Sequence, residues 1–126
     1  MDTPASVPAG VSVSLHRGRI RAGMSHEADA WMRMLNDRLD EARATLHRER
    51  MAVELVFRMR EGDDEYLYWI CIRGKAGQSV NTSEHPLDLD HLAFDERVRE
   101  RGWMLGTVEL VLIPSPVEHA ILSWVQ

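Results

Sequence analysis

The chain has 126 residues, 44% of them hydrophobic and 28% charged. These values exclude a disordered chain, a collagen-like repeat and a coiled coil, and they predict one domain with a single core. Fifteen basic and 20 acidic residues give a net charge of −5, which argues against a nucleic-acid-binding surface, because such surfaces need clustered Lys and Arg.

The cysteine content and the hydropathy of the sequence indicate which cellular location to expect. The single cysteine, Cys71, excludes an intramolecular disulfide and the multi-cysteine zinc and iron–sulfur sites, and it favours a reducing, cytoplasmic location. No apolar stretch approaches the roughly eighteen residues of a membrane span, and the N-terminus lacks the basic and apolar regions of a signal peptide. We therefore expect neither export nor membrane insertion.

The first ordered element is predicted to begin near Val11. Residues 1–10, MDTPASVPAG, carry two Pro, a Gly and small polar residues, a composition typical of a disordered tail. Val11, Val13 and Leu15 then alternate with polar residues, which indicates a half-buried strand. Gly18 lies where the alternation changes phase, so we expect a β-bulge there.

A long helix should follow from Ser25, because apolar residues recur at steps of three and four as far as Leu46 while the opposite face carries both signs of charge. Residues 51–60 alternate cleanly and predict a strand. The acidic run EGDDE at residues 61–65 is typical of a hairpin turn, and residues 66–73 form a partner strand that is apolar on both faces.

The second half of the chain predicts a long loop, a helix, a strand and a terminal helix. The loop spans Gly74–His85, and loops of this length are often functional. Pro86 should open a helix that runs to about Arg101. Residues 107–113 predict the last core strand, and a capping-box pattern at residues 115–118 predicts a short terminal helix, although residues 120–122 could instead pair as a strand.

The order of strands and helices predicts an α+β fold of the ferredoxin-like type over residues 11–114, with residues 115–126 as a helical extension. In this βαββαβ arrangement both helices cover one face of a four-stranded antiparallel sheet, and the other face is open. If paired residues of the hairpin sum to an even number near 126, the open face holds seven residues: Glu54, Val56, Arg58, Tyr66, Tyr68, Ile70 and Ile72. A face so rich in apolar and aromatic groups should be covered.

The hairpin and the second helix also carry a family resemblance. Two motifs are distinctive together: YLYW after the acidic turn, and SEHxxDxxH at residues 83–91. With the surrounding residues 46–51, 53–74 and 83–96 they resemble a functionally uncharacterised bacterial family. Its layout is similar to that of the dimeric α/β-barrel superfamily, which includes the antibiotic-biosynthesis monooxygenases. The resemblance covers about residues 11–114, and it implies a homodimer in which two sheets enclose a small molecule.

Two histidines are candidate catalytic residues. His85 ends the long loop, and His91 lies between Leu87 and Phe94 on the apolar stripe of the second helix. Imidazole titrates near neutral pH, so either residue could act as a general acid or base. The alternative is structural: His85 as the N-cap of the helix, and His91 as a core histidine with a backbone or carboxylate partner.

The central hairpin supplies the other candidates. Glu54 and Arg58 are predicted to share the open face with Tyr66, Tyr68 and Ile70, so a carboxylate with a shifted pKa would lie among residues that bind the substrate. The alternative is an ion pair that closes a dimer interface.

Metal and cofactor sites are not favoured by the sequence. Asp88 and His91, with His85 and Glu54, could ligate zinc or iron, but no HExxH or comparable spacing is present. We expect no metal and no cofactor, and we expect Cys71 to be an inert core residue.

The leading functional hypothesis is a small homodimeric enzyme that needs no cofactor. It would be a monooxygenase, isomerase or cyclase that acts on a small apolar or aromatic molecule inside the barrel. The alternative is a non-catalytic module that binds a small molecule or only dimerises. An RNA-binding domain ranks below both, because residues 66–73 lack the basic-glycine-aromatic pattern of that fold and the net charge is acidic.

Overall fold

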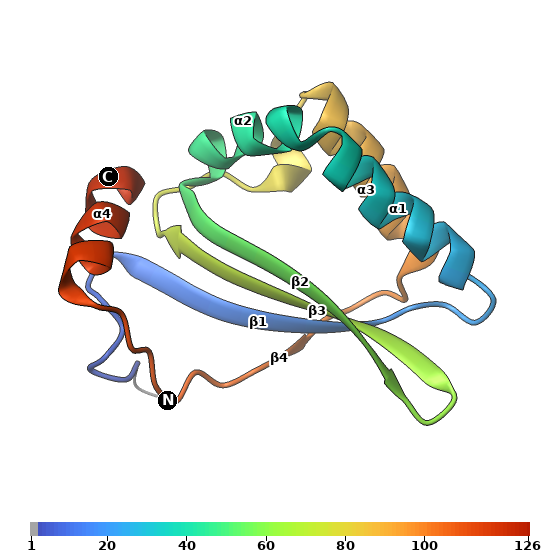
Figure 1. The fold of residues 1–126 in the computed structure, drawn as a ribbon, viewed down its shortest axis with the longest axis horizontal. Coiled ribbons are helices and arrows are strands. Elements are labelled where there is room, and N and C mark those ends of the chain that lie inside the picture. Colours follow the sequence, from blue (N-terminus) through green and yellow to red (C-terminus); the bar gives the residue numbers. More distant parts are fainter. Residues whose placement is uncertain (1–2) are drawn as a thin grey trace.

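The computed structural model describes residues 3–126 and has an α+β fold with a four-stranded antiparallel sheet (Figure 1). The elements in chain order are β1 (Val11–Arg19), α1 (Ser25–Asp37), α2 (Leu39–Glu49), β2 (Met51–Glu61), β3 (Asp64–Gly74), a 3₁₀ turn (Val80–Thr82), α3 (Pro86–Val98), β4 (Met104–Leu105) and α4 (Ser115–Val125). The strands are ordered β2-β3-β1-β4. Helices α1, α2 and α3 lie on one face of the sheet, and α4 lies at one end.

The register of the β2–β3 hairpin differs from the expectation by one residue. Gly62 adopts a φ of 64° in a two-residue turn, and Glu61 pairs with Asp64. Paired residues therefore sum to an odd number, and a shift of one residue moves every side chain of a strand to the opposite face. The prediction that Glu54, Val56 and Arg58 lie on the open face is wrong, because they share the helix-covered face with Leu67, Trp69 and Cys71.

The open face of the sheet is nevertheless apolar, as predicted, with a different contribution from β2. Leu55, Phe57 and Met59 replace the residues expected there, and their exposed fractions are 45%, 54% and 52%. They neighbour Tyr66, Tyr68 and Ile70 of β3, which lie on the open face as the sequence predicts. Helix α4 covers only the end of this face, where Ile121 and Val125 pack beside Val11, Val13 and Ile72.

The main core lies between the sheet and the three helices. Trp31 of α1 is fully buried, and its ring centroid lies 5.6 Å from that of Trp69 on β3. Aromatic groups of this size contribute much of the apolar area that the core removes from water. Gly18 of β1 allows the Arg99 side chain to pack directly against the strand, because a Cβ at this position would lie only 2.4 Å from Arg99 Cδ. The expected bulge at Gly18 is wrong, since β1 pairs with β3 without interruption.

The long helix predicted from Ser25 is divided into α1 and α2 at Arg38. This residue leaves helical geometry with a φ of −108° and a ψ of 43°. Its guanidinium donates hydrogen bonds to Glu41 and to Asp90 of α3, both at 2.6 Å. The ion pairs hold the bend, so α1 runs along α3 while α2 turns toward the start of β2.

The last predicted core strand does not form within this chain. Strand β4 contains only Met104 and Leu105, and residues 106–114 have no regular structure. After the amide of Gly106 donates to the carbonyl of Leu15, the chain leaves the edge of β1 (Figure 1). The alternating pattern is real, but Leu110 and Leu112 are 64% and 80% exposed because nothing in residues 3–126 covers them.

Residues 3–10 and helix α4 agree only in part with the expectations for the two ends of the chain. Helix α4 spans Ser115–Val125, so the predicted terminal helix is present and residues 120–122 do not form a strand. The expected capping box is wrong, because Ser115 is the first helical residue and the N-cap is Pro114, which has no side-chain cap hydrogen bond. Residues 3–10, expected to be disordered, contain turns, and Ser6 Oγ accepts a hydrogen bond from the Val111 amide. Met1 and Asp2, part of the same expectation, lie outside the described residues.

Candidate functional site

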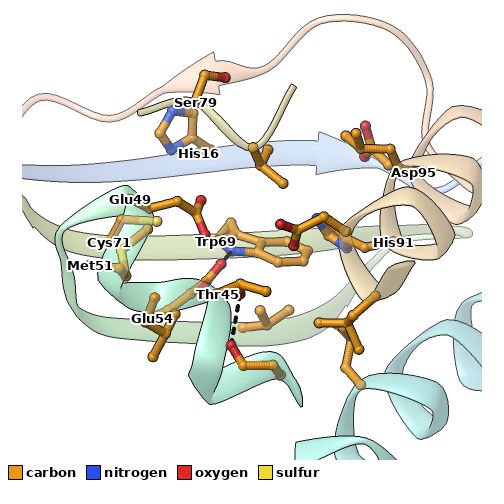
Figure 2. Close-up of a pocket in the computed structure, with 18 of the residues that line it drawn as sticks. His16, Thr45, Glu49, Met51, Glu54, Trp69, Cys71, Ser79, His91 and Asp95 are labelled. Carbon is orange, nitrogen blue, oxygen red and sulfur yellow. Dashed lines mark hydrogen bonds between the residues drawn. The ribbon is translucent and has the colours of Figure 1, made fainter. Parts of the chain in front are cut away.

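A cavity of about 720 Å³ opens between the sheet and helices α1, α2 and α3. We call it the helix-side cavity (Figure 2). Its volume lies within the range of small-molecule sites in proteins. Apolar side chains from all three helices line it, among them Met32, Leu46 and Leu87. Its acidic and imidazole groups are His16, Glu49, Glu54, Asp88, His91 and Asp95.

Glu54 projects from β2 toward Trp69 of β3. The indole Nε1–H of Trp69 donates a hydrogen bond to Glu54 Oε2, and no side chain of residues 3–126 donates to Oε1. Glu54 is exposed to the solvent of the cavity, but protein surrounds it on most sides, and this burial raises the pKa of its carboxyl. The charge of Asp88 acts in the same direction, while the Trp69 hydrogen bond partly opposes it.

Glu49, at the end of α2, brings a second carboxyl to the cavity. Figure 2 shows its side chain extending toward Trp69, beside that of Glu54. Burial raises the pKa of Glu49 to about 7, and the charges of Glu54 and Asp88 add to this effect. Asp88, in the first turn of α3, is only 4% exposed. Three carboxyl groups from α2, β2 and α3 therefore act on one another across the cavity.

His91 of α3 is fixed by the tryptophan of the core. The indole Nε1–H of Trp31 donates to His91 Nδ1 at 2.9 Å, and the His91 ring centroid lies 5.4 Å from that of Trp69. Burial lowers the pKa of His91, although Asp95 and Asp88 oppose the shift. The imidazole is therefore neutral at pH 7, and because Nδ1 accepts a hydrogen bond, the ring proton resides on Nε2.

Residues 11–119 match the model of a family of unknown function, DUF6176. The chain belongs to this family. The matched region extends from β1 into α4, so all residues that line the helix-side cavity lie within the DUF6176 segment. No curated protein and no solved structure matches the chain.

In this DUF6176 chain, Glu54 and His91 both line the cavity, whereas the other predicted site residues lie elsewhere. His85 caps α3 by accepting a hydrogen bond from the Leu87 amide at 3.1 Å, which is the structural alternative considered above. Arg58 does not pair with Glu54, because its guanidinium binds Asp29 of α1 at 2.6 Å.

The three residues expected to bind substrate, Tyr66, Tyr68 and Ile70, lie across the sheet from the cavity. The hydroxyl of Tyr68 donates to Glu61 at 2.7 Å and accepts a hydrogen bond from Arg17 Nε at 3.1 Å. The residues of the predicted site therefore lie on opposite faces of the sheet. The pairing register differs from the predicted one by a single residue, and this places Glu54 on the face opposite the tyrosines.

Sequence reasoning missed Glu49 and the role of the two tryptophans. Glu49 lies in the last turn of α2, where a charged residue gives no periodic signal of burial. Gly62 is the sequence signal for the correct register. A two-residue turn at this glycine predicts that Glu54 lies on the same face of the sheet as Trp69. The long loop does contribute to the site, because Ser79 and Asn81 line the cavity.

The described residues contain neither a cluster of metal ligands nor a membrane-spanning helix. Among residues 3–126 no three His, Cys, Asp or Glu side chains converge as metal ligands would. Cys71 lines the cavity floor, and burial raises the pKa of its thiol to about 12, so it remains protonated and a poor nucleophile. No helix within residues 3–126 has the length and apolar character needed to cross a membrane.

Proposed function

We propose that this DUF6176 protein is a proton-transfer enzyme, an isomerase or cyclase, that acts on a small molecule in the helix-side cavity. One observation carries the proposal: a carboxyl with a raised pKa, Glu54, is held by the Trp69 indole while its second oxygen is free to reach a ligand. A general base works best when its pKa lies near the working pH, and burial moves Glu54 in that direction.

The surroundings of Glu54 support the same chemistry. Met32, Leu46 and Val56 offer apolar walls for an aromatic or aliphatic body. The neutral His91 imidazole carries its proton on Nε2, which no acceptor within residues 3–126 engages, so it can donate to a carbonyl oxygen of the substrate. Such a donor stabilises the charge that develops on that oxygen when Glu54 removes a proton from the adjacent carbon. Return of the proton to another carbon gives isomerisation. Attack of the new carbanion on a second carbonyl carbon of the same molecule breaks that C=O π bond, and transfer of the proton from Glu54 to the resulting alkoxide completes a cyclisation.

Deuterium exchange tests this proposal without knowledge of the natural substrate. Three small aromatic ketones, 2-tetralone, phenylacetone and 1-indanone, are incubated with the protein in D₂O, and loss of the α-proton signal is followed by NMR. Wild type is expected to exchange at least one ketone about tenfold faster than Glu54→Gln. The matched control Glu84→Gln, at an exposed loop position, should behave as wild type. Equal rates for wild type and Glu54→Gln on all three ketones would favour the non-catalytic binding or dimerisation module.

We also propose that the fold is ferredoxin-like and that two chains pack through their open faces as in dimeric α/β barrels. The helix and strand order and the strand arrangement β2-β3-β1-β4 support this. Leu55, Phe57 and Met59 leave an apolar surface that a single chain does not cover. The segment 106–114 carries exposed leucines away from the sheet edge, where a second copy could cover them.

In such a dimer the two sheets seal one another, and each helix-side cavity stays within its own subunit. The enzyme would then have two equivalent sites. A reducing, cytoplasmic location is part of the proposal, supported by the single buried thiol of Cys71.

A further inference from the structure

Residues 107–113 have the sequence pattern of a strand but no strand beside them. Among residues 3–126 only one amide of this segment donates a hydrogen bond, that of Val111 to Ser6 Oγ. No carbonyl of the segment accepts one from the backbone of residues 3–126. Successive amides of a strand point to opposite edges. Because Val111 is directed to Ser6, the amides of Leu110 and Leu112 remain for a partner strand.

The segment is anchored at both ends and borders the open face of the sheet. At its start, the Gly106 amide donates to the Leu15 carbonyl, and a Cβ at Gly106 would lie 3.3 Å from Leu15 Cβ. At its end, Ile113 packs in the same apolar cluster as Val13. Leu15 and Val13 belong to the open face, because they pair with Ile70 and Ile72. The exposed leucines between these anchors therefore lie at the margin of that face.

Strand β2 has a free edge that matches this segment. It is the outermost strand in the order β2-β3-β1-β4, and it pairs only with β3. Apart from the Met51 carbonyl, which accepts a hydrogen bond from the Trp124 indole, no backbone group on its outer edge has a hydrogen-bond partner in residues 3–126. An unpaired edge of this kind is a template for the addition of another strand.

The segment and the free edge of β2 cannot meet within one chain. Strands β3 and β1 lie between β2 and β4, and three strand spacings separate the two edges by about 14 Å. Figure 1 shows the segment running from β4 to α4 on the β1 side, with β2 across the sheet. The contacts of Gly106 and Ile113 hold it there. A strand that pairs with residues 107–113 through the edge of β2 must therefore come from another molecule.

We propose that residues 107–113 of one chain add as a strand to the outer edge of β2 in a second copy, and that the second copy returns the same contact. The inference rests on the proposed dimer and names the segment that joins its two sheets. Both halves of the contact are present in one chain, as a twofold interface requires. This self-complementarity favours a second copy over an unrelated partner.

Packing of the open faces about an axis parallel to the strands brings these parts together. Such an axis places the β4 side of each sheet over the β2 side of the other. Packed sheets lie about 10 Å apart, so a segment that leaves one sheet at its margin reaches the facing edge. Leu110 and Leu112, which are 64% and 80% exposed in the single chain, then cover Phe57, which is 54% exposed.

Contacts between chains test the inference. Protein labelled with ¹³C and ¹⁵N is mixed with unlabelled protein, and an isotope-filtered NOE experiment records only contacts that join a labelled chain to an unlabelled one. We expect cross-peaks from the methyl groups of Leu110 and Leu112 to the ring protons of Phe57. The amides of Leu110 and Leu112 should also exchange with D₂O about tenfold more slowly than that of Glu109, which lies on the opposite edge of the added strand.

A matched pair of variants measures the contribution of the segment to the dimer. Leu110→Ser should raise the dimer Kd, measured by sedimentation velocity over a dilution series, at least about tenfold, because each dimer loses two apolar contacts. The neighbouring control Glu109→Ser should change the Kd by about threefold or less. Both side chains are exposed in the single chain, so neither change should disturb the fold.

The outcomes separate this inference from the proposed dimer. A dimer in which NOEs connect only the two open faces, or connect residues 107–113 to β1 of the other chain, overturns the addition to β2 and leaves the dimer standing. A Kd for Leu110→Ser no higher than that for Glu109→Ser also overturns it. A monomeric wild type contradicts both the dimer and the strand addition, whereas proton transfer in the helix-side cavity is tested separately by ketone exchange.

Discussion

Replacing Glu49 with Gln should make the protein more stable at alkaline pH, which is unusual for the loss of a charged residue. Burial and the neighbouring acids raise the pKa of Glu49 from 4.5 to about 7. Between these two values the folded chain holds a proton that the unfolded chain has released. The free energy of unfolding of wild type therefore falls as the pH rises through this window. Glu49→Gln has no such proton to lose.

The size of the effect follows from the shift. The difference between 4.5 and about 7 is about 2.5 pKa units, equivalent to about 3.5 kcal/mol at most, since one unit corresponds to about 1.4 kcal/mol. Glu49 keeps partial solvent contact, so about 1–2 kcal/mol is the expected effect.

Urea denaturation of wild type and Glu49→Gln at about pH 5 and about pH 8.5 measures this effect. The variant should gain about 1–2 kcal/mol relative to wild type between the two pH values, while the exposed control Glu84→Gln should follow wild type. The contributions of Glu54 and His91 to the pH dependence are present in every variant and cancel to a first approximation. If the difference in free energy of unfolding between wild type and Glu49→Gln is the same at both pH values, the raised pKa of Glu49 within the carboxyl cluster is refuted.

Three further changes test other parts of the structure. Gly18→Ala should lower the free energy of unfolding by about 1–3 kcal/mol, because the new Cβ would collide with Arg99; an unchanged urea midpoint would contradict that close approach. Trp31→Phe removes the donor to His91 and leaves a smaller ring in the core, so a loss of about 2–4 kcal/mol is expected by the same assay. Phe57→Glu places a charge on the open face and should convert a dimer to monomers in sedimentation velocity. A wild-type protein that sediments as a monomer would contradict the dimer.

Periodicity located most elements, because local patterns of apolar residues reflect which face of an element is buried. The alternation at Val11–Leu15 and the apolar stripe of residues 117–125 correspond to real elements, β1 and α4. The same approach failed where the outcome depends on partners distant in sequence. Residues 107–113 alternate as a strand does, yet the chain leaves the edge of β1 after Leu105 and these residues pair with no strand among residues 3–126. The bend at Arg38 depends on Asp90, which a helical pattern cannot reveal.

The candidate site was only partly predictable for a related reason. His91 attracts attention as a histidine on an apolar stripe, and the structure places it in the cavity. The sequence predicts Glu54 as a carboxyl on the same face as the tyrosines, but the two-residue turn at Gly62 puts it on the other face of the sheet. The convergence of Glu49 and Asp88 with Glu54 joins α2, α3 and β2, so no local pattern contains it.

The titration of Glu54 measures whether this carboxyl has the raised pKa that a general base in the helix-side cavity needs. In protein labelled with ¹³C and ¹⁵N, the Glu54 carboxyl carbon and the Trp69 indole N–H are followed by NMR across the acidic and neutral range. We expect the carboxyl carbon to titrate with a midpoint above 4.5, and the signal of the indole N–H, which donates to the same carboxyl, to follow the same curve. A midpoint at or below 4.5, or an indole signal that does not respond, would contradict this expectation.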